Sequence, residues 1–150
     1  MTAGGPQLYW LPLATWERDG LKAALNRAGL PCQDVEAPGR YFWRFEEEDM
    51  PVGFGGIEMH GEIALLRSVV ILPPLRHQGL GHAITAALEG EALALGARAI
   101  YLVTAGEAPF FADQGFAPCS LDVVPPEVSG CDEFSAAAPG AVIVMSKRLG

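Results

Sequence analysis

The chain has 150 residues, 50% of them hydrophobic, and a formal net charge of −8 at pH 7. This length predicts one domain over residues 1–150, and the acidic balance excludes nucleic acid, which is bound through clustered Lys and Arg. No apolar run reaches the roughly 18 residues of a membrane span, and the first residues lack a signal-peptide pattern. We therefore expect a cytoplasmic protein without membrane contact. The three widely spaced cysteines predict neither a disulfide framework nor a metal site.

The first half of the chain predicts a strand, a helix and an antiparallel meander. Residues 7–12 are typical of a short strand, and Thr15 of a helix N-cap. The helix that follows carries an apolar stripe and then meets a glycine and a proline that end it: Leu21, Ala24, Leu25 and Ala28, then Gly29 and Pro31. Three strands are expected next, with His60 and Gly61 as the last turn: 41–46, 51–59 and 62–72.

The second half predicts a long helix, then strands around a short helix. The long helix covers 79–95, ends at Gly96 and has four leucine or isoleucine side chains on one side: Leu80, Ile84, Leu88 and Leu95. The remaining elements are a strand at 98–103, a helix at 107–114 and strands at 116–122 and 141–148. This order predicts an α/β domain with a mixed sheet of about six to seven strands and about four helices. The long helix should return a parallel strand.

A glycine-rich turn joins a strand to the start of the long helix. It reads Arg-His-Gln-Gly-Leu-Gly from Arg76 to Gly81. Glycines let backbone N–H groups approach an anion, and the helix dipole favours negative charge there. The turn therefore predicts a phosphate site built from local dipoles and a few cations in an acidic protein. His77 and His82 flank the glycines and either touch phosphates or face solvent.

These residues resemble the GNAT superfamily of N-acetyltransferases, which transfer acetyl groups from acetyl-CoA to amines. The resemblance rests on the glycine turn after a long strand and on Gly115-Phe116 after Phe110-Phe111, and it covers nearly the whole chain. Five phrases resemble the arsenic-resistance branch in particular: Leu65–Ser68, Arg76–Gly81, Tyr101–Thr104, Phe110–Phe116 and Glu133–Phe134. That branch carries Leu-Cys-Pro where this chain has Ala137-Ala138-Pro139, so a thiolate that could bind arsenic is missing there.

The resemblance implies a GNAT fold and a set of cofactor residues. Main-chain groups of Val70 and Ile71 would pair with the pantetheine arm like an added strand. The pyrophosphate would sit on N–H groups from Gln78 to Ala83, with Arg76 as a fixed cation. The full expected cofactor set is Val70, Ile71, Arg76, His77, Gln78, Gly79, Leu80, Gly81, His82, Ala83 and Phe111.

Two positions depart from the family pattern. Many of these enzymes have a tyrosine where this chain has Phe111, placed to protonate the leaving thiolate, and an asparagine where it has Thr104. Phe111 cannot donate a proton, so water or another group would have to do so. Thr104 and Ser68 are expected near the substrate.

Glu58 and Arg67 are the candidate catalytic residues. If His60-Gly61 is the hairpin loop, Glu58 lies opposite Ile63 and Phe54 lies opposite Arg67, which puts Glu58 and Arg67 on one sheet face. They would be four residues apart along the strands, or roughly 13 Å, too far for a direct pair. Glu58 is then a candidate general base for the acceptor amine.

Arg67 needs a partner, because its face is otherwise apolar. Strand alternation places four apolar residues on that face, namely Ile63, Leu65, Val69 and Ile71, and an unpaired buried guanidinium is costly. A substrate carboxylate could pair with it, and Arg67 would then bind substrate. An internal acid is the alternative, namely Glu36, Asp132 or Glu133, with Glu58 pointing to solvent.

Two functions remain open from the sequence. The first is an acetyl-CoA-dependent acetyltransferase that acts by direct attack on a small amine bearing a carboxylate, such as an amino acid or an amino-acid-like toxin. The second is a CoA-binding sensor or scaffold without catalysis, which Phe111 and Thr104 favour. The sequence also leaves open whether the last strand pairs with a second copy to form a homodimer.

Overall fold

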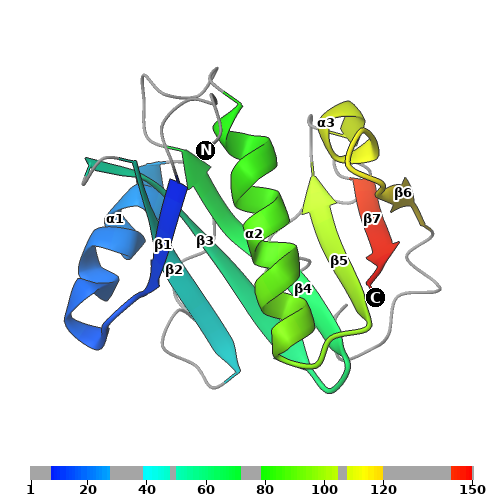
Figure 1. Cartoon of the computed structure of the whole chain (residues 1–150), viewed down its shortest axis with the longest axis horizontal. Helices are drawn as coiled ribbons and strands as arrows, with labels where there is room; N and C mark the ends of the chain where they lie inside the picture. Colours follow the sequence, from blue (N-terminus) through cyan, green and yellow to red (C-terminus); the bar gives the residue numbers. More distant parts are fainter. Residues whose placement is uncertain are drawn as a thin grey trace, which may run out of the picture.

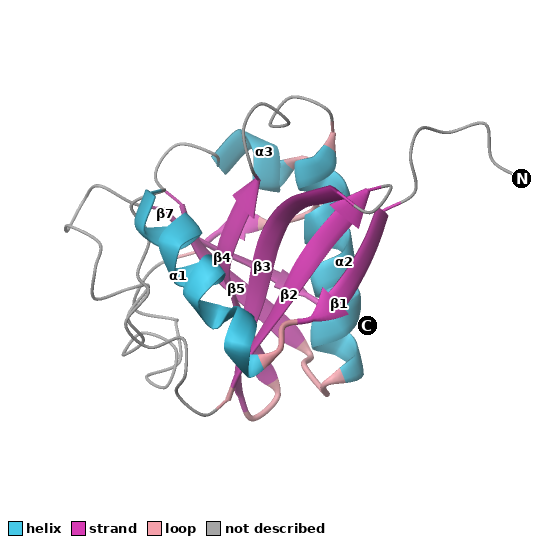
Figure 2. Ribbon diagram, turned by 90° about the vertical axis from the view of Figure 1, so that its left-hand side faces the viewer, coloured by secondary structure: helices cyan, strands magenta, loops and turns pink. Residues whose placement is uncertain are grey.

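The structure, a computed structural model, describes residues 8–27, 39–47, 50–71, 79–104, 108–119 and 143–149. They form a mixed sheet with helices on both faces (Figures 1 and 2). The strands are β1 (Leu8–Pro12), β2 (Arg40–Glu47), β3 (Met50–His60), β4 (Ile63–Ile71), β5 (Ala99–Thr104), β6 (Ala117–Pro118) and β7 (Ile143–Arg148). The helices are α1 (Arg18–Arg27), α2 (Leu80–Ala94) and α3 (Ala108–Ala112), and a 3-10 turn (Thr15–Glu17) precedes α1.

The described residues form seven strands of this sheet, in the order β1-β2-β3-β4-β5-β7-β6. All neighbours are antiparallel except β4 and β5, which are parallel and joined by the α2 crossover. The predicted α/β class, the antiparallel meander and the parallel return are therefore confirmed. The described part of the strand expected at 116–122 is limited to the two residues of β6.

The face of the sheet under α2 carries the larger apolar core. Leu80, Ile84 and Leu88 are buried there, as the helical stripe predicted. Leu95 was expected in the same stripe but is 37% exposed. The reason is that α2 ends at Ala94, so Leu95 is the C-cap and Ala92 takes the next buried position.

The opposite face is covered by α1 (Figure 2). Leu21, Ala24 and Leu25 are buried there as predicted; Ala28, Gly29 and Pro31 lie outside the described residues. They pack in a second cluster with Phe42 of β2 and Val70 of β4. This smaller cluster leaves room on the same face for polar side chains.

The β3–β4 hairpin has a different register from the predicted one. Its loop is Gly61-Glu62 and not His60-Gly61, because His60 already pairs with Ile63, and Gly61 adopts a φ of 64°. Moving a two-residue loop by one position keeps each side chain on its face but changes its cross-strand partner. Glu58 therefore lies opposite Leu65, and Arg67 lies opposite Gly56.

A β-bulge interrupts β4 directly after Arg67. Gly56 pairs with Arg67 and Phe54 pairs with Val70, so Ser68 and Val69 together lie opposite the single residue Gly55. An extra residue reverses the alternation of side chains beyond it. Val69 and Ile71 accordingly pack against the α2-side core, and Val70 packs on the α1 side. The assignment of Val69 and Ile71 to the face of Arg67 was therefore wrong.

Candidate functional site

β4 and β5 separate toward their C-terminal ends. Only Ile63, Ala64 and Leu65 of β4 pair with β5, through Ala99 to Tyr101. β4 nevertheless continues to Ile71 and β5 to Thr104, and Figure 1 shows the two strands side by side at their starts and apart at their ends. Over the separated part, each strand keeps its other neighbour, β3 or β7. The facing edges of β4 and β5 thus have no ladder between them.

Helix α2 starts near the diverging ends of β4 and β5 (Figure 1). Gly79 is the N-cap residue in the left-handed region, φ 73°, with no side-chain capping bond. No acidic residue occupies the first turn of α2. Backbone N–H groups at such a helix start can bind an anion.

The predicted cofactor residues are partly described. Gly79, Leu80, Gly81, His82 and Ala83 form the start of α2, and Val70 and Ile71 end β4. Arg76, His77 and Gln78 lie outside the described residues. The described cofactor residues therefore lie at the end of β4 and at the start of α2, two elements that are consecutive in the chain.

Gly81 lies against Phe110 of helix α3. A Cβ on Gly81 would come within 2.8 Å of the Phe110 ring and 3.6 Å of Ile71 Cδ1. Phe110 also contacts the His82 ring edge-on, at 4.7 Å between centroids. Close approach of α3 to α2 thus requires glycine at position 81.

Phe111 is half-buried within a chain of aromatic contacts. Its ring lies 5.0 Å from Phe110 and 5.7 Å from Phe116, both edge-to-face. It also packs against the α2-side core. The helix therefore presents packed hydrocarbon, with no ionisable group, at the position where the family pattern has a tyrosine.

Of the two expected substrate residues, Thr104 is described and the side chain of Ser68 is not. Thr104 is 5% exposed and ends β5, where it pairs with Ile143 of β7. Ser68 belongs to the bulge in β4 by its backbone. Both positions lie along the separated parts of β4 and β5.

Glu58 and Arg67 form a direct ion pair on the α1 face. Arg67 Nη1 lies 3.0 Å from Glu58 Oε1, and both side chains are 0% exposed. The shared face is confirmed, but the predicted separation of roughly 13 Å was wrong. The register explains it: Arg67 lies two residues along β4 from Leu65, the residue directly opposite Glu58, so Glu58 and Arg67 form a diagonal pair within reach of long side chains.

The pair belongs to a group of four polar side chains. Arg40 Nε lies 3.4 Å from Glu58 Oε1, and His60 Nε2 lies 2.6 Å from Glu58 Oε2. Both oxygens of Glu58 are therefore in contact with nitrogen groups. Arg40 and His60 are partly exposed, at 18% and 20%, and connect the buried pair to the surface. Sequence reasoning missed both residues, because only the register reveals that Arg40 faces Glu58.

Phe42 completes the surroundings of Arg67. The guanidinium carbon lies 5.6 Å from the centre of the Phe42 ring, within cation–π range. Phe42, Gly56 and Arg67 form one row across β2, β3 and β4. A Cβ on Gly56 would lie 2.6 Å from the Phe42 ring, so the absent side chain lets the ring lie over the sheet beside Arg67.

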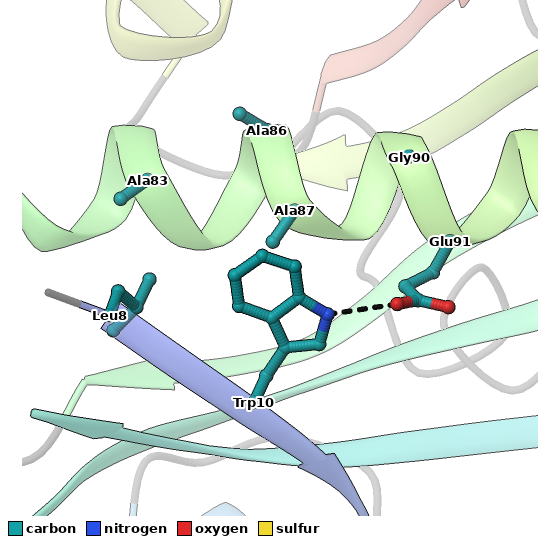
Figure 3. A pocket seen from close by; sticks show the side chains of 7 residues that line it. All are labelled: Leu8, Trp10, Ala83, Ala86, Ala87, Gly90 and Glu91. Atoms are coloured by element: carbon teal, nitrogen blue, oxygen red, sulfur yellow. Dashed lines mark hydrogen bonds between the residues drawn. The ribbon is translucent and has the colours of Figure 1, made fainter.

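A shallow groove lies on the outer side of α2, between this helix and β1 (Figure 3). Its volume is about 400 Å³, and Trp10 Nε1 donates a hydrogen bond of 2.8 Å to Glu91 across it. The lining residues are Leu8, Trp10, Ala83, Ala86, Ala87, Gly90 and Glu91. Ala83 is the single predicted site residue among them.

The described part of the chain contains no helix long and apolar enough to cross a membrane. Within the same residues, no group of three or more His, Cys, Asp or Glu side chains is arranged to hold a metal ion.

The model of the Acetyltransferase (GNAT) family matches residues 6–116. No curated protein matches the sequence significantly.

Several solved structures share the fold. N-acetylglutamate synthase from Neisseria gonorrhoeae, complexed with coenzyme A and L-arginine, has a TM-score of 0.76 and 14% identity. The match covers 97% of this chain and 34% of the synthase, so this chain spans about a third of that protein's length. Rv2747 from Mycobacterium tuberculosis, in a complex that contains CoA, has a TM-score of 0.74 and 21% identity over 95% of this chain and 99% of that one. The ribosomal-protein-S18-alanine N-acetyltransferase from Escherichia coli has a TM-score of 0.71 and 16% identity, with coverage of 96% and 95%.

Proposed function

This chain belongs to the Acetyltransferase (GNAT) family, and we propose that it transfers the acetyl group of acetyl-CoA to the primary amine of a small acceptor that carries a carboxylate. The amine nitrogen attacks the thioester carbonyl carbon directly, an N–C bond forms and the C–S bond breaks. Coenzyme A leaves as a thiolate and takes up a proton, while the attacking ammonium loses one.

The observation that carries this proposal is the separation of β4 and β5 below the start of α2. The part of β4 beyond its pairing with β5, which includes Val70, would offer main-chain groups to an extended amide-containing arm, as one more strand would. The first turn of α2, from Gly79 to Ala83, offers N–H groups to a pyrophosphate. The β4 edge and the first turn of α2 are consecutive along the chain, as pantetheine and pyrophosphate are consecutive in CoA.

The acceptor class rests on Arg67. A guanidinium has five donors in a fixed fork that matches a carboxylate, but Arg67 is 0% exposed and paired with Glu58, so a substrate carboxylate would reach it only after the α1 face opens. The N-acetylglutamate synthase structures contain amino-acid ligands, but at 14–15% identity they share only the fold with this chain. Glu58 stays a candidate base, although a substrate amine would have to displace one of its present partners. The arsenic-resistance branch also stays a prediction.

Phe111 favours a second candidate, a CoA-binding protein without catalysis. A packed phenyl ring cannot protonate a leaving thiolate, and its neighbours Phe110 and Phe116 are equally inert. Under this alternative the protein binds CoA and acetylates no acceptor.

The first test is binding of the cofactor. We expect acetyl-CoA and CoA, but not NAD or ATP, to raise the melting temperature, because a ligand at one hundred times its Kd adds about 2.7 kcal/mol of stability. Gly81→Ala should weaken CoA binding tenfold or more, because its Cβ would displace Phe110 from the first turn of α2.

Gly90→Ala is the matched control on the same helix. A Cβ there meets nothing within 4 Å, so CoA affinity should stay unchanged. Equal loss in both variants, or no melting shift with CoA in the wild type, would contradict the cofactor site.

The second test separates enzyme from binding module. Purified protein is assayed with acetyl-CoA against amino acids, amino-acid-like toxins, polyamines and aminoglycosides. Arg67→Lys keeps a cation beside Glu58 but loses the fork, so turnover of carboxylate-bearing amines should fall at least tenfold while the CoA melting shift remains. Background turnover across the whole panel would favour the non-catalytic alternative.

A further inference from the structure

Lys147 of β7 makes three contacts that join separate elements. Its Nζ lies 2.7 Å from Glu89 Oε1 on α2 and donates a 2.7 Å hydrogen bond to the main-chain oxygen of Gln114, just after α3. The same nitrogen lies 5.8 Å from the centre of the Phe116 ring. The lysine side chain is 28% exposed and Glu89 is 16% exposed, so the contacts are partly shielded from water.

Helix α3 depends on such contacts for its position. It has five residues, too few to be stable by itself. In its middle, Phe110 packs on Gly81 and His82 in the first turn of α2. Beyond its C-terminal end, the turn that follows α3 is bound by Lys147. The helix is therefore attached at two points, and the first is the helix start that we assign to the cofactor.

The Gly115-Phe116 pair has a physical explanation in this arrangement. Gly115 adopts a φ of 97°, and a Cβ there would lie 3.2 Å from Lys147 Cε. Glycine thus allows both the turn and the passage of the lysine stem, and the following Phe116 supplies the ring below its ammonium group. Lys147 comes from a strand distant in sequence, so the motif alone does not reveal it.

We propose that Lys147 is a positioning residue that fixes α3 against α2 and thereby sets the affinity of the first turn of α2 for coenzyme A. This inference rests on the proposed function. Lys147 acts through Gln114 and Phe116 on the position of Phe110. The loss of this contact releases one end of α3 and loosens the packing of Phe110 on Gly81.

The experiment measures CoA affinity by calorimetry in the full chain, together with the urea midpoint of each variant. Lys147→Met keeps the hydrocarbon stem and removes the charge and the donors, and we expect the Kd for CoA to rise about fivefold. Lys147→Arg should restore most of the affinity, since it keeps a cation and donors at the same place. Glu89→Gln removes the ionic contact alone and should have a smaller effect.

Arg98→Met is the matched control. Arg98 forms an ion pair with Glu62 far from α3, at 79% and 72% exposure, and its loss should leave the Kd unchanged. In turnover assays, Lys147→Met should raise the KM for acetyl-CoA and leave kcat within twofold.

The outcomes are distinct. A lower urea midpoint for Lys147→Met with an unchanged Kd would make the lysine purely structural and overturn the proposal. A raised Kd that arginine does not rescue would also overturn it. If the wild type itself binds no CoA, the proposed function fails first, and the role of Lys147 fails with it.

Discussion

The two faces of the sheet are built on different principles. On the α2 face, apolar side chains form the larger described core, from Trp43 through Ile84 and Leu88 to Met145, and Thr85 of α2 is buried as well. On the α1 face, an apolar cluster under the helix adjoins the buried pair of Glu58 and Arg67. Dispersion and hydrophobic burial hold the first face, whereas part of the second depends on compensation between charges.

The two faces should differ in how well they tolerate substitutions. An apolar core tolerates rearranged side chains of similar total volume. A buried ion pair tolerates the loss of neither partner, because the remaining charge is left desolvated. The α1 face is therefore the costlier place to alter, and we infer that its polar group is kept for recognition more than for stability.

The largest effect should come from breaking the buried pair. Glu58→Leu leaves the Arg67 guanidinium without this carboxylate, and we expect a loss of about 3–5 kcal/mol in the free energy of unfolding. The double variant Glu58→Leu/Arg67→Met should recover most of that loss. Urea denaturation measures both. Equal destabilisation of the single and double variants would show that charge compensation is not what holds this face.

A large but smaller effect is expected on the apolar face. Leu88→Ala opens a cavity at a fully buried site and should cost about 3 kcal/mol. A Cβ on Gly55 would lie 2.6 Å from Leu88 Cδ1, so Gly55→Ala alone should destabilise by overpacking.

Combining the two changes sharpens the comparison. In the double variant the added methyl fills part of the cavity, so Gly55→Ala should become neutral or stabilising in the Leu88→Ala background. The same urea measurement decides this, and strictly additive losses would contradict a steric coupling between these positions.

The smallest effect should come from the exposed end of the polar group. His60→Ala removes the 2.6 Å hydrogen bond to Glu58, but at 20% exposure water can replace the imidazole, so the cost should be about 1 kcal/mol. Glu62→Gln in the exposed pair with Arg98 provides the comparison and should change stability by less than about 0.5 kcal/mol. If both variants behave alike, His60 is not part of the group that holds Glu58.

The elements themselves could be predicted from the sequence because periodicity and helix or turn signals are local. Leu21, Ala24 and Leu25 identified the buried side of α1, and Gly96 identified the end of α2. The glycine turn before α2 stood out because strand, turn and helix signals coincide there. Each of these inferences needs only neighbours in the chain.

The contacts of the candidate site could not be predicted in the same way. Whether Glu58 meets Arg67 depends on which residue of the hairpin takes the positive φ, and both His60-Gly61 and Gly61-Glu62 place a glycine in the loop. The bulge at Ser68 and Val69 has no local signature, yet it decides the side of every later residue in β4. Lys147 meets Gln114 only through the pairing of β7.

The position of β7 has a consequence for how the chain folds. This strand lies between β5 and β6, although it follows both in the sequence. Its pairs with β5 join distant residues, which raises contact order and slows folding. During synthesis, β5, α3 and β6 all emerge before the strand that binds them together. We therefore expect the nascent chain to expose the edge of β5 until β7 is made.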